Sequence, residues 1–363
     1  MVALDAFRGI TIAAMILVNN PGTWNDVYPS LQHAAWNGWT PTDLIFPFFL
    51  FIVGVAVTLS IGERPPPGQM RWQLGVKIVR RGLLICALGL FLNGFPRFDW
   101  SVLRIPGVLQ RIAACYLFAS LIVLTMGVRA QAAIAVALVG GYWALMRFVP
   151  VPAYGVGGLQ PETNLAAYVD DTLLHGHLLH AGWDPEGLLT TLPALATTLA
   201  GVLTGVWLRA GRPHAERIAA LLVAGNLAVA LGGLLDAWWP INKSLWTGSY
   251  VLLTAGMALN VLGVCDWLID FKGYRRWATP FVVFGMNPIV AYVLSSLTAK
   301  AMLLWPVTRT DGSITNLQQY VFQTFFGPVG SALNASLFYA LAYVLFWLGI
   351  TAVLYRNRAV IKI

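Results

Sequence analysis

Charged side chains are scarce in this chain of 363 residues, of which only 10% are Asp, Glu, Lys or Arg. Soluble domains carry about 25% charge, so the composition argues against an ordinary soluble enzyme or binding module. Hydrophobic residues make up 58% of the chain, and the mean hydropathy is +0.70. These values predict an integral membrane protein embedded in membrane lipids.

Cysteine is also rare. The chain has three cysteines, all inside apolar runs: Cys86, Cys115 and Cys265. Their spacing fits neither a disulfide framework nor a metal site, so we expect small core residues. The histidines His175, His177 and His180 are close in sequence, but this spacing does not put all three on one helical face. The sequence therefore predicts no metal site.

A cleavable signal peptide is not evident. Residues 1–20 contain an apolar stretch, but no small-residue cleavage site follows it. The chain opens abruptly on the apolar stretch, which predicts that a short native N-terminal segment precedes it.

Ten apolar runs divide the chain, each close to the ~20 residues that cross a bilayer as a helix. In lipid such runs must be helical, because their backbone groups find no water. We place them near residues 8–21, 43–61, 75–95, 107–127, 130–149, 187–209, 216–236, 245–268, 278–304 and 331–355. The sequence therefore predicts an all-α integral membrane protein, a bundle of about ten transmembrane helices that forms a single domain over residues 1–363.

The basic residues are distributed unevenly between the two sides that this segmentation defines. If both termini are cytoplasmic, 16 of the 23 Lys and Arg residues fall on the inner side and 7 on the outer side. Positive charge concentrates in cytoplasmic loops, so the bias predicts an N-in, C-in orientation. Orientation in a membrane also explains the net charge of +8, and we expect no nucleic-acid partner.

One histidine, His33, lies in the first outer loop, residues 22–42. An imidazole titrates near neutral pH and suits proton transfer or acyl relay. An imidazole also suits an interfacial hydrogen bond to a lipid headgroup or a backbone carbonyl. Spacing alone favours this structural interpretation of His33. Asp43 begins the second run, where it can cap the helix or orient His33 or a sugar hydroxyl.

Three asparagines lie at membrane depth, where polar groups are costly and face the interior of a bundle. Asn19 and Asn20 close the first run, and Asn287 lies inside the ninth. An amide can hold a carbonyl oxygen or a sugar hydroxyl, or it can bond to a neighbouring helix. The residues leave both interpretations open.

Gln110 and Arg111 lie near the outer start of the fourth run. An arginine inside a span is a functional candidate and usually has an acidic partner. Asp99 and the acids of residues 150–186 are available for this. The alternative is that Arg111 extends toward the membrane surface.

Two further outer loops carry polar and aromatic residues. Asp184 and Glu186 precede the sixth run, where they can cap its helix or bind the ammonium of an amino sugar. Asn242, Lys243 and Trp246 precede the eighth run.

The inner side carries clusters of cations that include Arg8, Lys77, Arg80, Arg81, Arg275 and Arg276. The bias of positive charge toward the cytoplasm already accounts for such clusters. The functional interpretation is that they bind a cytosolic ligand rich in phosphate.

Seven pieces of the chain resemble, in order and content, the heparan-α-glucosaminide N-acetyltransferase family of transmembrane acyltransferases, including its bacterial NagX-like members. They are residues 5–9, 33–38, 43–47, 104–111, 184–187, 242–246 and 285–287. The resemblance implies an enzyme that takes acetyl from cytosolic acetyl-CoA and delivers it to the amine of a glucosamine on the other side. It also implies a homodimer.

The family's catalytic histidine corresponds to His33, and the asparagine that closes the preceding helix corresponds to Asn19. The large lumenal N-terminal domain of the lysosomal enzyme is missing from this sequence, so the resemblance favours a small periplasmic amino sugar. The expected location is a bacterial inner membrane, with His33 at the periplasmic side.

We assign the catalytic role to His33, Asn19 and Asp43. The predicted acceptor-binding residues are Asn20, Trp36, Asn37, Gln110, Arg111, Asp184, Glu186, Asn242, Lys243, Trp246 and Asn287. The predicted acetyl-CoA-binding residues are Arg8, Lys77, Arg80, Arg81, Arg275 and Arg276. No metal is expected.

Two mechanisms fit this assignment. His33 can deprotonate the amine for direct attack in a ternary complex, with Asn19 donating to the thioester oxygen, or it can be acetylated first. We favour the ternary route, because a CoA threaded through the bundle already brings its acetyl group to an outer acceptor. The alternative functions are a sugar or amino-sugar transporter and an O-acyltransferase of a cell-envelope glycan.

Overall fold

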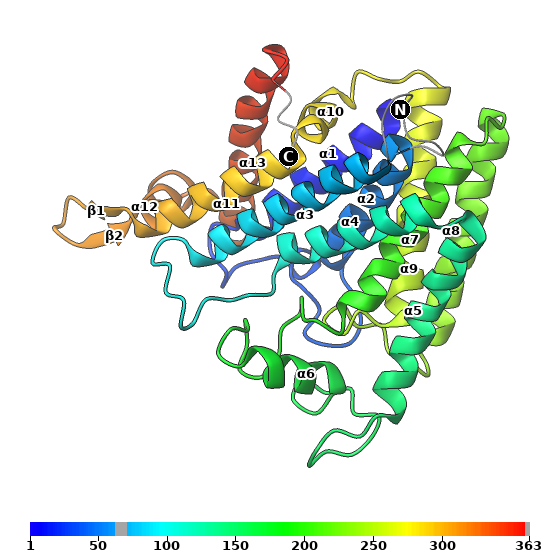
Figure 1. The fold of residues 1–363 in the computed structure, drawn as a ribbon. Helices are drawn as coiled ribbons and strands as arrows, with labels where there is room; N and C mark the ends of the chain where they lie inside the picture. Colours follow the sequence, from blue (N-terminus) through cyan, green and yellow to red (C-terminus); the bar gives the residue numbers. More distant parts are fainter. Residues whose placement is uncertain (62–70, 360–363) are drawn as a thin grey trace. The chain divides into compact units, whose positions relative to one another are not determined.

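The structure is a computed structural model that describes residues 1–61 and 71–359. The chain forms two compact units. Unit 1 comprises Met1–Ala34, Thr40–Phe46 and the C-terminal part from Cys265 onward; unit 2 comprises Ala35–Trp39 and Pro47–Val264. Figure 1 labels the helices and strands of both.

Unit 1 is built around the first and last helices of the chain. Its elements are α1 (Val2–Asn19), the short 3₁₀ turns η1 (Pro29–Leu31) and η2 (Pro41–Leu44), the π-helical turn η3 (Asp266–Phe271), α10 (Thr279–Met286), α11 (Pro288–Leu304), β1 (Pro306–Thr308), β2 (Ile314–Asn316), α12 (Leu317–Val321), the π-helical turn η4 (Phe322–Phe326) and α13 (Ala332–Arg356). The strands β1 and β2 pair antiparallel.

Unit 2 holds the middle of the chain, which α2 (Ile45–Ile61) enters and α9 (Gly248–Cys265) leaves. Its other helices are α3 (Arg71–Gly94), α4 (Val108–Thr125), α5 (Val128–Phe148), α6 (Leu165–Leu174), α7 (Thr191–Arg209) and α8 (His214–Leu235).

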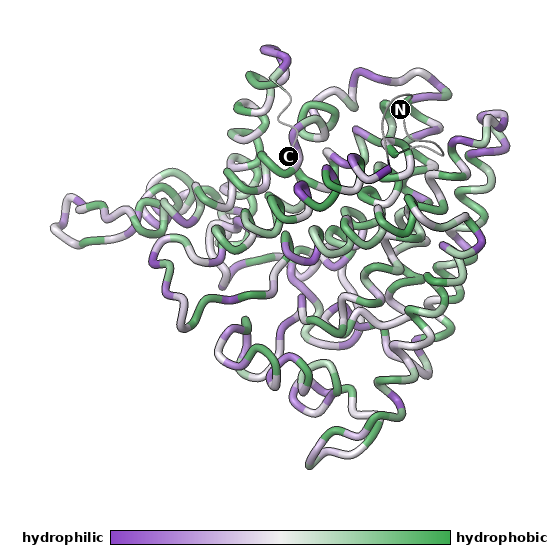
Figure 2. The backbone as a smooth tube through the Cα atoms, in the orientation of Figure 1, coloured by the Kyte–Doolittle hydropathy of each residue, from purple (hydrophilic) through white to green (hydrophobic). Residues whose placement is uncertain are grey.

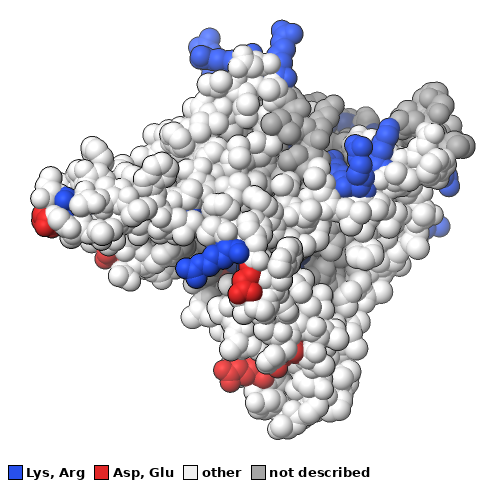
Figure 3. Space-filling view, turned by 60° about the vertical axis from the view of Figure 1, so that its left-hand side comes forward, with Lys and Arg blue, Asp and Glu red and all other residues white. Residues whose placement is uncertain are grey.

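The predicted class is confirmed: the protein is an all-α, multi-pass membrane protein. Eight helices of the described residues are long and apolar enough to cross a membrane, or nine if the bent pair α10–α11 is one span. Figure 2 shows hydrophobic residues along most of these helices and hydrophilic residues mainly at their ends and in the connections. Figure 3 shows one face on which charged side chains form only a few small groups.

Each of the ten predicted runs is helical in the described residues, and the third run is the one that does not pass this test. The predicted third run corresponds to α3, which is 24 residues long but carries four cations in its first half: Arg71, Lys77, Arg80 and Arg81. Because these charges are costly in lipid, α3 is not among the eight.

The predicted ninth run, residues 278–304, is broken by an 84° bend between α10 and α11. The break falls at Asn287-Pro288, because a proline has no N–H to donate and disfavours helical backbone in the residue before it. Proline is well tolerated in the first turn of a helix, so Pro288 starts α11.

Two structured parts of the long loops, residues 150–186 and 305–329, were not predicted. Within residues 150–186 the helix α6 begins at Asn164, whose side chain accepts a hydrogen bond from the N–H of Ala167 at 2.8 Å. Beyond α11, β1, β2 and α12 lie together at the far end of that helix in Figure 1. Short elements of this kind leave little hydrophobic periodicity to detect.

The core of unit 1 depends on a close backbone contact between α1 and α10. A Cβ atom on Gly9 would lie 1.6 Å from the carbonyl oxygen of Phe281, and one on Gly285 would lie 2.0 Å from that of Asp5. Small residues allow such approach between membrane helices, where packing rather than hydrophobicity drives association. In unit 2, Gly54 plays the same part against the carbonyl of Thr198.

We expect Gly9→Ala to destabilise the protein by about 1–3 kcal/mol, because the added methyl group has no space beside α10. The matched control is Gly140→Ala in α5, where an added Cβ meets no described atom within 4 Å. Denaturant titration in detergent micelles measures both. Equal stability of the two variants would contradict the close contact between α1 and α10.

Candidate active site

One carboxylate, that of Asp43, holds the loop before α2 together in unit 1. Its Oδ1 lies 2.7 Å from Nδ1 of His33, and its Oδ2 accepts from the backbone N–H groups of Ala34 and Thr40, each at 3.0 Å. The Thr40 hydroxyl donates to the carbonyl of Gln32 at 2.6 Å. The Asp43 side chain is 1% exposed and that of His33 is 53% exposed. The carboxylate is therefore buried and occupied, while the imidazole reaches the surface.

This arrangement sets the chemistry of His33. When Asp43 is ionised, the neutral imidazole keeps its proton on Nδ1, so the lone pair is on Nε2. The contact also fixes the orientation of the ring, so that Nε2 is the nitrogen left for a substrate. The sequence left three roles open for Asp43, and the structure contains the contacts of two of them. The carboxylate closes a capping box with Thr40, and it lies against His33.

Asn19 and Asn20 differ in what their amides do. Asn20 donates to the carbonyl of Ile16 at 2.7 Å, and so caps the end of α1. Asn19, the last residue of α1, is exposed, and its side-chain amide makes no hydrogen bond to the described residues. Only the Asn19 amide is therefore available to a substrate.

Trp36 and Asn37 belong to unit 2, where the short segment Ala35–Trp39 is fastened to two loops. The indole N–H of Trp36 donates to the carbonyl of Leu159 at 2.9 Å. The amide of Asn242 donates to Oδ1 of Asn37 at 3.1 Å. Asn37 is exposed and Asn242 is buried, so Asn242 positions Asn37 rather than contacting a ligand from solution.

The remaining acceptor candidates of this loop are less accessible. Trp246 is 1% exposed, and its indole N–H donates to Thr197 Oγ1 at 3.1 Å. We therefore withdraw its role in acceptor binding, because no face of the ring is open. Lys243 is half-buried.

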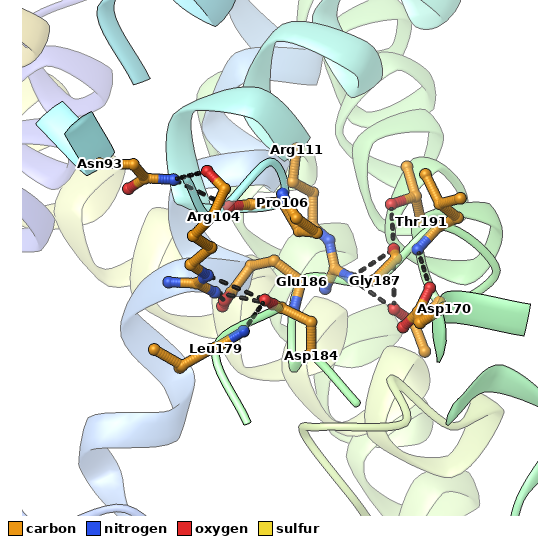
Figure 4. A network of polar contacts seen from close by, with 12 residues as sticks. Asn93, Arg104, Pro106, Arg111, Asp170, Leu179, Asp184, Glu186, Gly187 and Thr191 are labelled. Atoms are coloured by element: carbon orange, nitrogen blue, oxygen red, sulfur yellow. Dashed lines mark hydrogen bonds and ion pairs between the residues drawn. The ribbon is translucent and has the colours of Figure 1, made fainter. Parts of the chain in front are cut away.

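Arg104 joins the two acids that the sequence assigned to sugar binding (Figure 4). Its Nε and Nη2 donate to the two oxygens of Asp184 at 2.8 and 2.7 Å, and Nη2 also donates to Glu186 at 2.6 Å. The side chains of Asp184 and Glu186 are 0% and 9% exposed. Burial opposes the charge of Arg104, but the hydrogen bond to Asp184 and the charge of Glu186 raise the pKa of Arg104 overall.

Asp184 also accepts from the N–H groups of Leu179 and Glu186, each at 2.9 Å. The two acids are therefore a buried anionic centre that Arg104 neutralises, and not free partners for an ammonium. Arg104 was missed as a site residue, although it lies in one of the family-like pieces. The sequence did contain a signal for it: residues 150–186 carry several acids and no Lys or Arg, so a buried acid of that loop needs a cation from another part of the chain.

Arg111 does not pair with a carboxylate in the described residues, contrary to expectation. It is 2% exposed and donates to the carbonyl of Gly187 at 3.1 Å (Figure 4). It also donates to the hydroxyl of Thr190. Its guanidinium lies over the ring of Trp246, 5.1 Å from the centroid. Arg111 therefore anchors the start of α7 against α4 and does not extend to the membrane surface. Its neighbour Gln110 packs against Gly89 of α3.

Asp170, on α6, was not recognised in the sequence. It is 1% exposed and accepts from the N–H of Leu188 at 2.8 Å, and a Cβ on Gly187 would lie 1.8 Å from its Oδ2. Burial raises the pKa of Asp170 to about 6, and the charge of Asp184 acts in the same direction. Asp170 thus ties α6 to the turn that both arginines hold.

The predicted acetyl-CoA-binding cations do not form one described cluster. Arg8 pairs with Asp5 and donates to the carbonyl of Gly285, both at 3.1 Å, in unit 1. Lys77, Arg80 and Arg81 are exposed on α3 in unit 2, and Arg275 and Arg276 are exposed before α10 in unit 1. Asn287 lies at the α10–α11 break and donates to the carbonyl of Ala359 at 3.0 Å, so its assignment to the sugar loses support.

The comparisons with known proteins decide the family. Residues 1–232 match the family model described as heparan-alpha-glucosaminide N-acetyltransferase, catalytic. The chain belongs to this family. It is 29% identical over 349 residues to the heparan-alpha-glucosaminide N-acetyltransferase of Homo sapiens and 28% identical over 348 residues to that of Mus musculus. Each match covers 80% of this chain and 52% of the relative, so the chain spans about half the length of these relatives.

We expect Arg104→Gln to destabilise the protein by about 3–5 kcal/mol, because the substitution leaves two buried carboxylates without their cation. The control is Arg212→Gln, whose pair with Glu216 is exposed and should contribute less than about 1 kcal/mol. Denaturant titration compares the two. Similar losses would contradict a buried anionic centre.

We expect Asp170 to make stability depend on pH. Its folded pKa of about 6 lies above the ordinary value of 3.8, so its favourable contribution is complete below pH 3.8 and is lost as the pH rises through 6. Asp170→Asn removes this titration. The stability of the variant relative to the parent should therefore rise between pH 4 and 8, by up to about 3 kcal/mol. Unfolding curves across this range measure it, and a constant difference would contradict the raised pKa.

Proposed function

We propose that this protein transfers an acetyl group from acetyl-CoA to the amine of a glucosamine-type sugar, with His33 as the general base. The observation that carries the proposal is the pair of an exposed His33 and a buried Asp43, 2.7 Å apart. Membership of the N-acetyltransferase family supports the reaction class. The homologous relatives are named for an α-glucosaminide acceptor, which supports an amino sugar.

The reaction balances with these groups alone. The neutral amine attacks the thioester carbonyl, a C–N bond forms, and Nε2 of His33 takes the proton from the nitrogen. The tetrahedral intermediate then breaks its C–S bond, and the imidazolium returns the proton to the departing thiolate. The products are an N-acetyl sugar and free CoA, and His33 is restored.

Asn19 is the proposed donor to the oxyanion. Its amide is exposed at the end of α1 and makes no hydrogen bond to the described residues. A donor that is already in place when charge develops on the thioester oxygen lowers the barrier. We propose the ternary complex rather than an acetylated His33, because a thioester held near an outer acceptor needs no covalent relay.

The proposed orientation is N-in and C-in, with the donor in the cytoplasm and the acceptor in the periplasm of a bacterial inner membrane. The distribution of cations supports this orientation. A homodimer remains a prediction from the family resemblance.

A transporter is the second candidate, because the α10–α11 pair is bent by 84°. Transporters place broken helices at their substrate sites, usually as a pair in the two halves of the fold. Among the described residues only one such bent pair is present, and the His33–Asp43 pair suits general-base chemistry. These two observations favour the acetyltransferase.

The deciding experiment supplies acetyl-CoA to the protein in proteoliposomes with a panel of amino sugars and neutral sugars, and reads the products by mass spectrometry. Acetylation of an amine supports the proposal. Acetylation of hydroxyl groups only would favour the O-acyltransferase, and sugar uptake without acetylation would favour the transporter.

We expect His33→Ala to lower kcat by about 10²–10⁴-fold, because general-base catalysis is lost, while CoA binding survives. Asp43→Asn should also lower kcat, because an amide N–H can donate to Nδ1 and so move the ring proton to Nε2, where the lone pair is needed. The matched control is His175→Ala. His175 pairs with Asp171 at 2.8 Å, but both side chains are exposed on and after α6. Full activity of His33→Ala would remove His33 from the mechanism.

A further inference from the structure

A cavity of about 350 Å³ lies at the break between α10 and α11 in unit 1. It is lined by Met286, Asn287, Tyr355, Arg356 and Arg358. Small-molecule sites have volumes of roughly 300–1,000 Å³, so the cavity is large enough for part of a ligand. None of the sequence motifs assigned to the acceptor or to catalysis, other than Asn287, contributes to it.

The cavity is a fixed feature of the fold because both of its sides are tied together. Asn287, which is 1% exposed, donates from Nδ2 to the carbonyl of Ala359 at 3.0 Å. Arg8 donates to the carbonyl of Gly285, two residues before the break. The end of α13 and the break are therefore held in one place by side-chain hydrogen bonds.

The lining carries two positive charges. No acidic residue is among the described residues of the lining, and neither Arg356 nor Arg358 forms an ion pair within the part of the chain that the structure describes. Two guanidinium groups on one cavity repel each other and attract an anion. Arginine binds phosphate oxygens through several parallel N–H donors, which makes a phosphate the best-matched anion.

The backbone at Arg358 supplies an independent argument. The end of α13 is a Schellman motif: the N–H of Ala359 donates to Leu354 O at 2.9 Å and that of Arg358 to Tyr355 O at 3.0 Å. In this motif the residue with positive φ is usually glycine. Here it is Arg358, with φ of 53°, although a side chain is disfavoured in that region. Because glycine would be less strained at this position, the presence of an arginine indicates that the guanidinium group has a function there.

The other wall of the cavity suits a ring. Tyr355 presents a partly exposed phenol and Met286 a thioether, and both pack well against aromatic systems. The start of α11 adds partial positive charge, but α10 ends at the same point and offsets it, so the arginines supply the net charge.

We propose that this cavity binds a phosphate-bearing nucleotide, with Arg356 and Arg358 on the phosphate and Tyr355 beside the base. This inference rests on the proposed function in one respect: with acetyl-CoA as donor, the ligand is its adenosine 3′-phosphate portion. An anionic lipid headgroup offers the same phosphate chemistry, so the experiment has to separate the two sources.

The test compares coenzyme A with 3′-dephospho-coenzyme A by calorimetry, using the full chain in nanodiscs of phosphatidylcholine alone. We expect the parent protein to bind coenzyme A roughly 10- to 100-fold more tightly than the dephospho form, because it makes charge-assisted hydrogen bonds to one more phosphate. In Arg358→Gly this ratio should fall close to one. Glycine relieves the positive φ, so the variant should fold at least as well as the parent.

The control is Arg129→Gln, which removes one exposed cation from the start of α5 and should keep the parent ratio. An unchanged ratio in Arg358→Gly overturns the inference. A second result would also overturn it. If phosphatidylglycerol added to the nanodiscs competes at the cavity, and Arg358→Gly abolishes this competition but leaves the nucleotide ratio unchanged, the occupant is a lipid.

Failure of the proposed function has a different signature. If the parent prefers coenzyme A to its dephospho form and Arg358→Gly loses that preference, but no sugar is acetylated, the cavity inference stands and the acetyltransferase proposal fails. If acetylation occurs and the ratio is insensitive to Arg358, only the cavity inference fails.

Discussion

A polar group removed from water needs a partner, and most of the internal organisation of this protein follows from that requirement. In lipid the backbone meets it by forming helices. Side chains meet it at a few points. The carboxylate of Asp43 is almost fully buried, and its two oxygens are shared between His33 and two backbone N–H groups. The loop between α1 and α2 takes its form around that one group.

The same requirement organises unit 2 on a larger scale. Asp184 and Glu186 are buried because Arg104 compensates their charge, and Asp170 is buried beside them at the cost of a raised pKa. Arg111 satisfies part of its hydrogen-bonding capacity on Gly187 and Thr190 and lies over Trp246. The turn of residues 184–190 is thus held by two cations, Arg104 and Arg111. It supports the position of α6 and α7 rather than presenting open carboxylates to a sugar.

These contacts separate side chains that are open to solvent from side chains that hold others in place. His33 and Asn19 keep exposed functional groups, whereas Asp43, Asn242 and Trp246 are buried and occupied. The broken α10–α11 pair follows a similar division. Its backbone is stabilised by Arg8 and Asn287, and two cations at the end of α13, Arg356 and Arg358, line a cavity beside it. The proposed acetyl-CoA donor is longer than a sugar, and the proposal gives it two separate contact regions in unit 1: the exposed groups of His33 and Asn19, and the cationic cavity.

The sequence by itself determined the membrane class, the approximate bounds of nearly every long helix, the family, and the choice of His33 as a candidate site residue. Hydrophobic runs and short motifs are local properties of the chain, so the sequence alone shows them. Tertiary structure decided the rest. Arg104 pairs with acids 80 and 82 positions away, and Asn287 bonds to Ala359, which is 72 positions away. Asp170 is buried on the short helix α6, which leaves little hydrophobic periodicity to detect. Spacing cannot show whether a polar side chain is open or already satisfied, since that depends on which groups the fold brings within hydrogen-bonding distance.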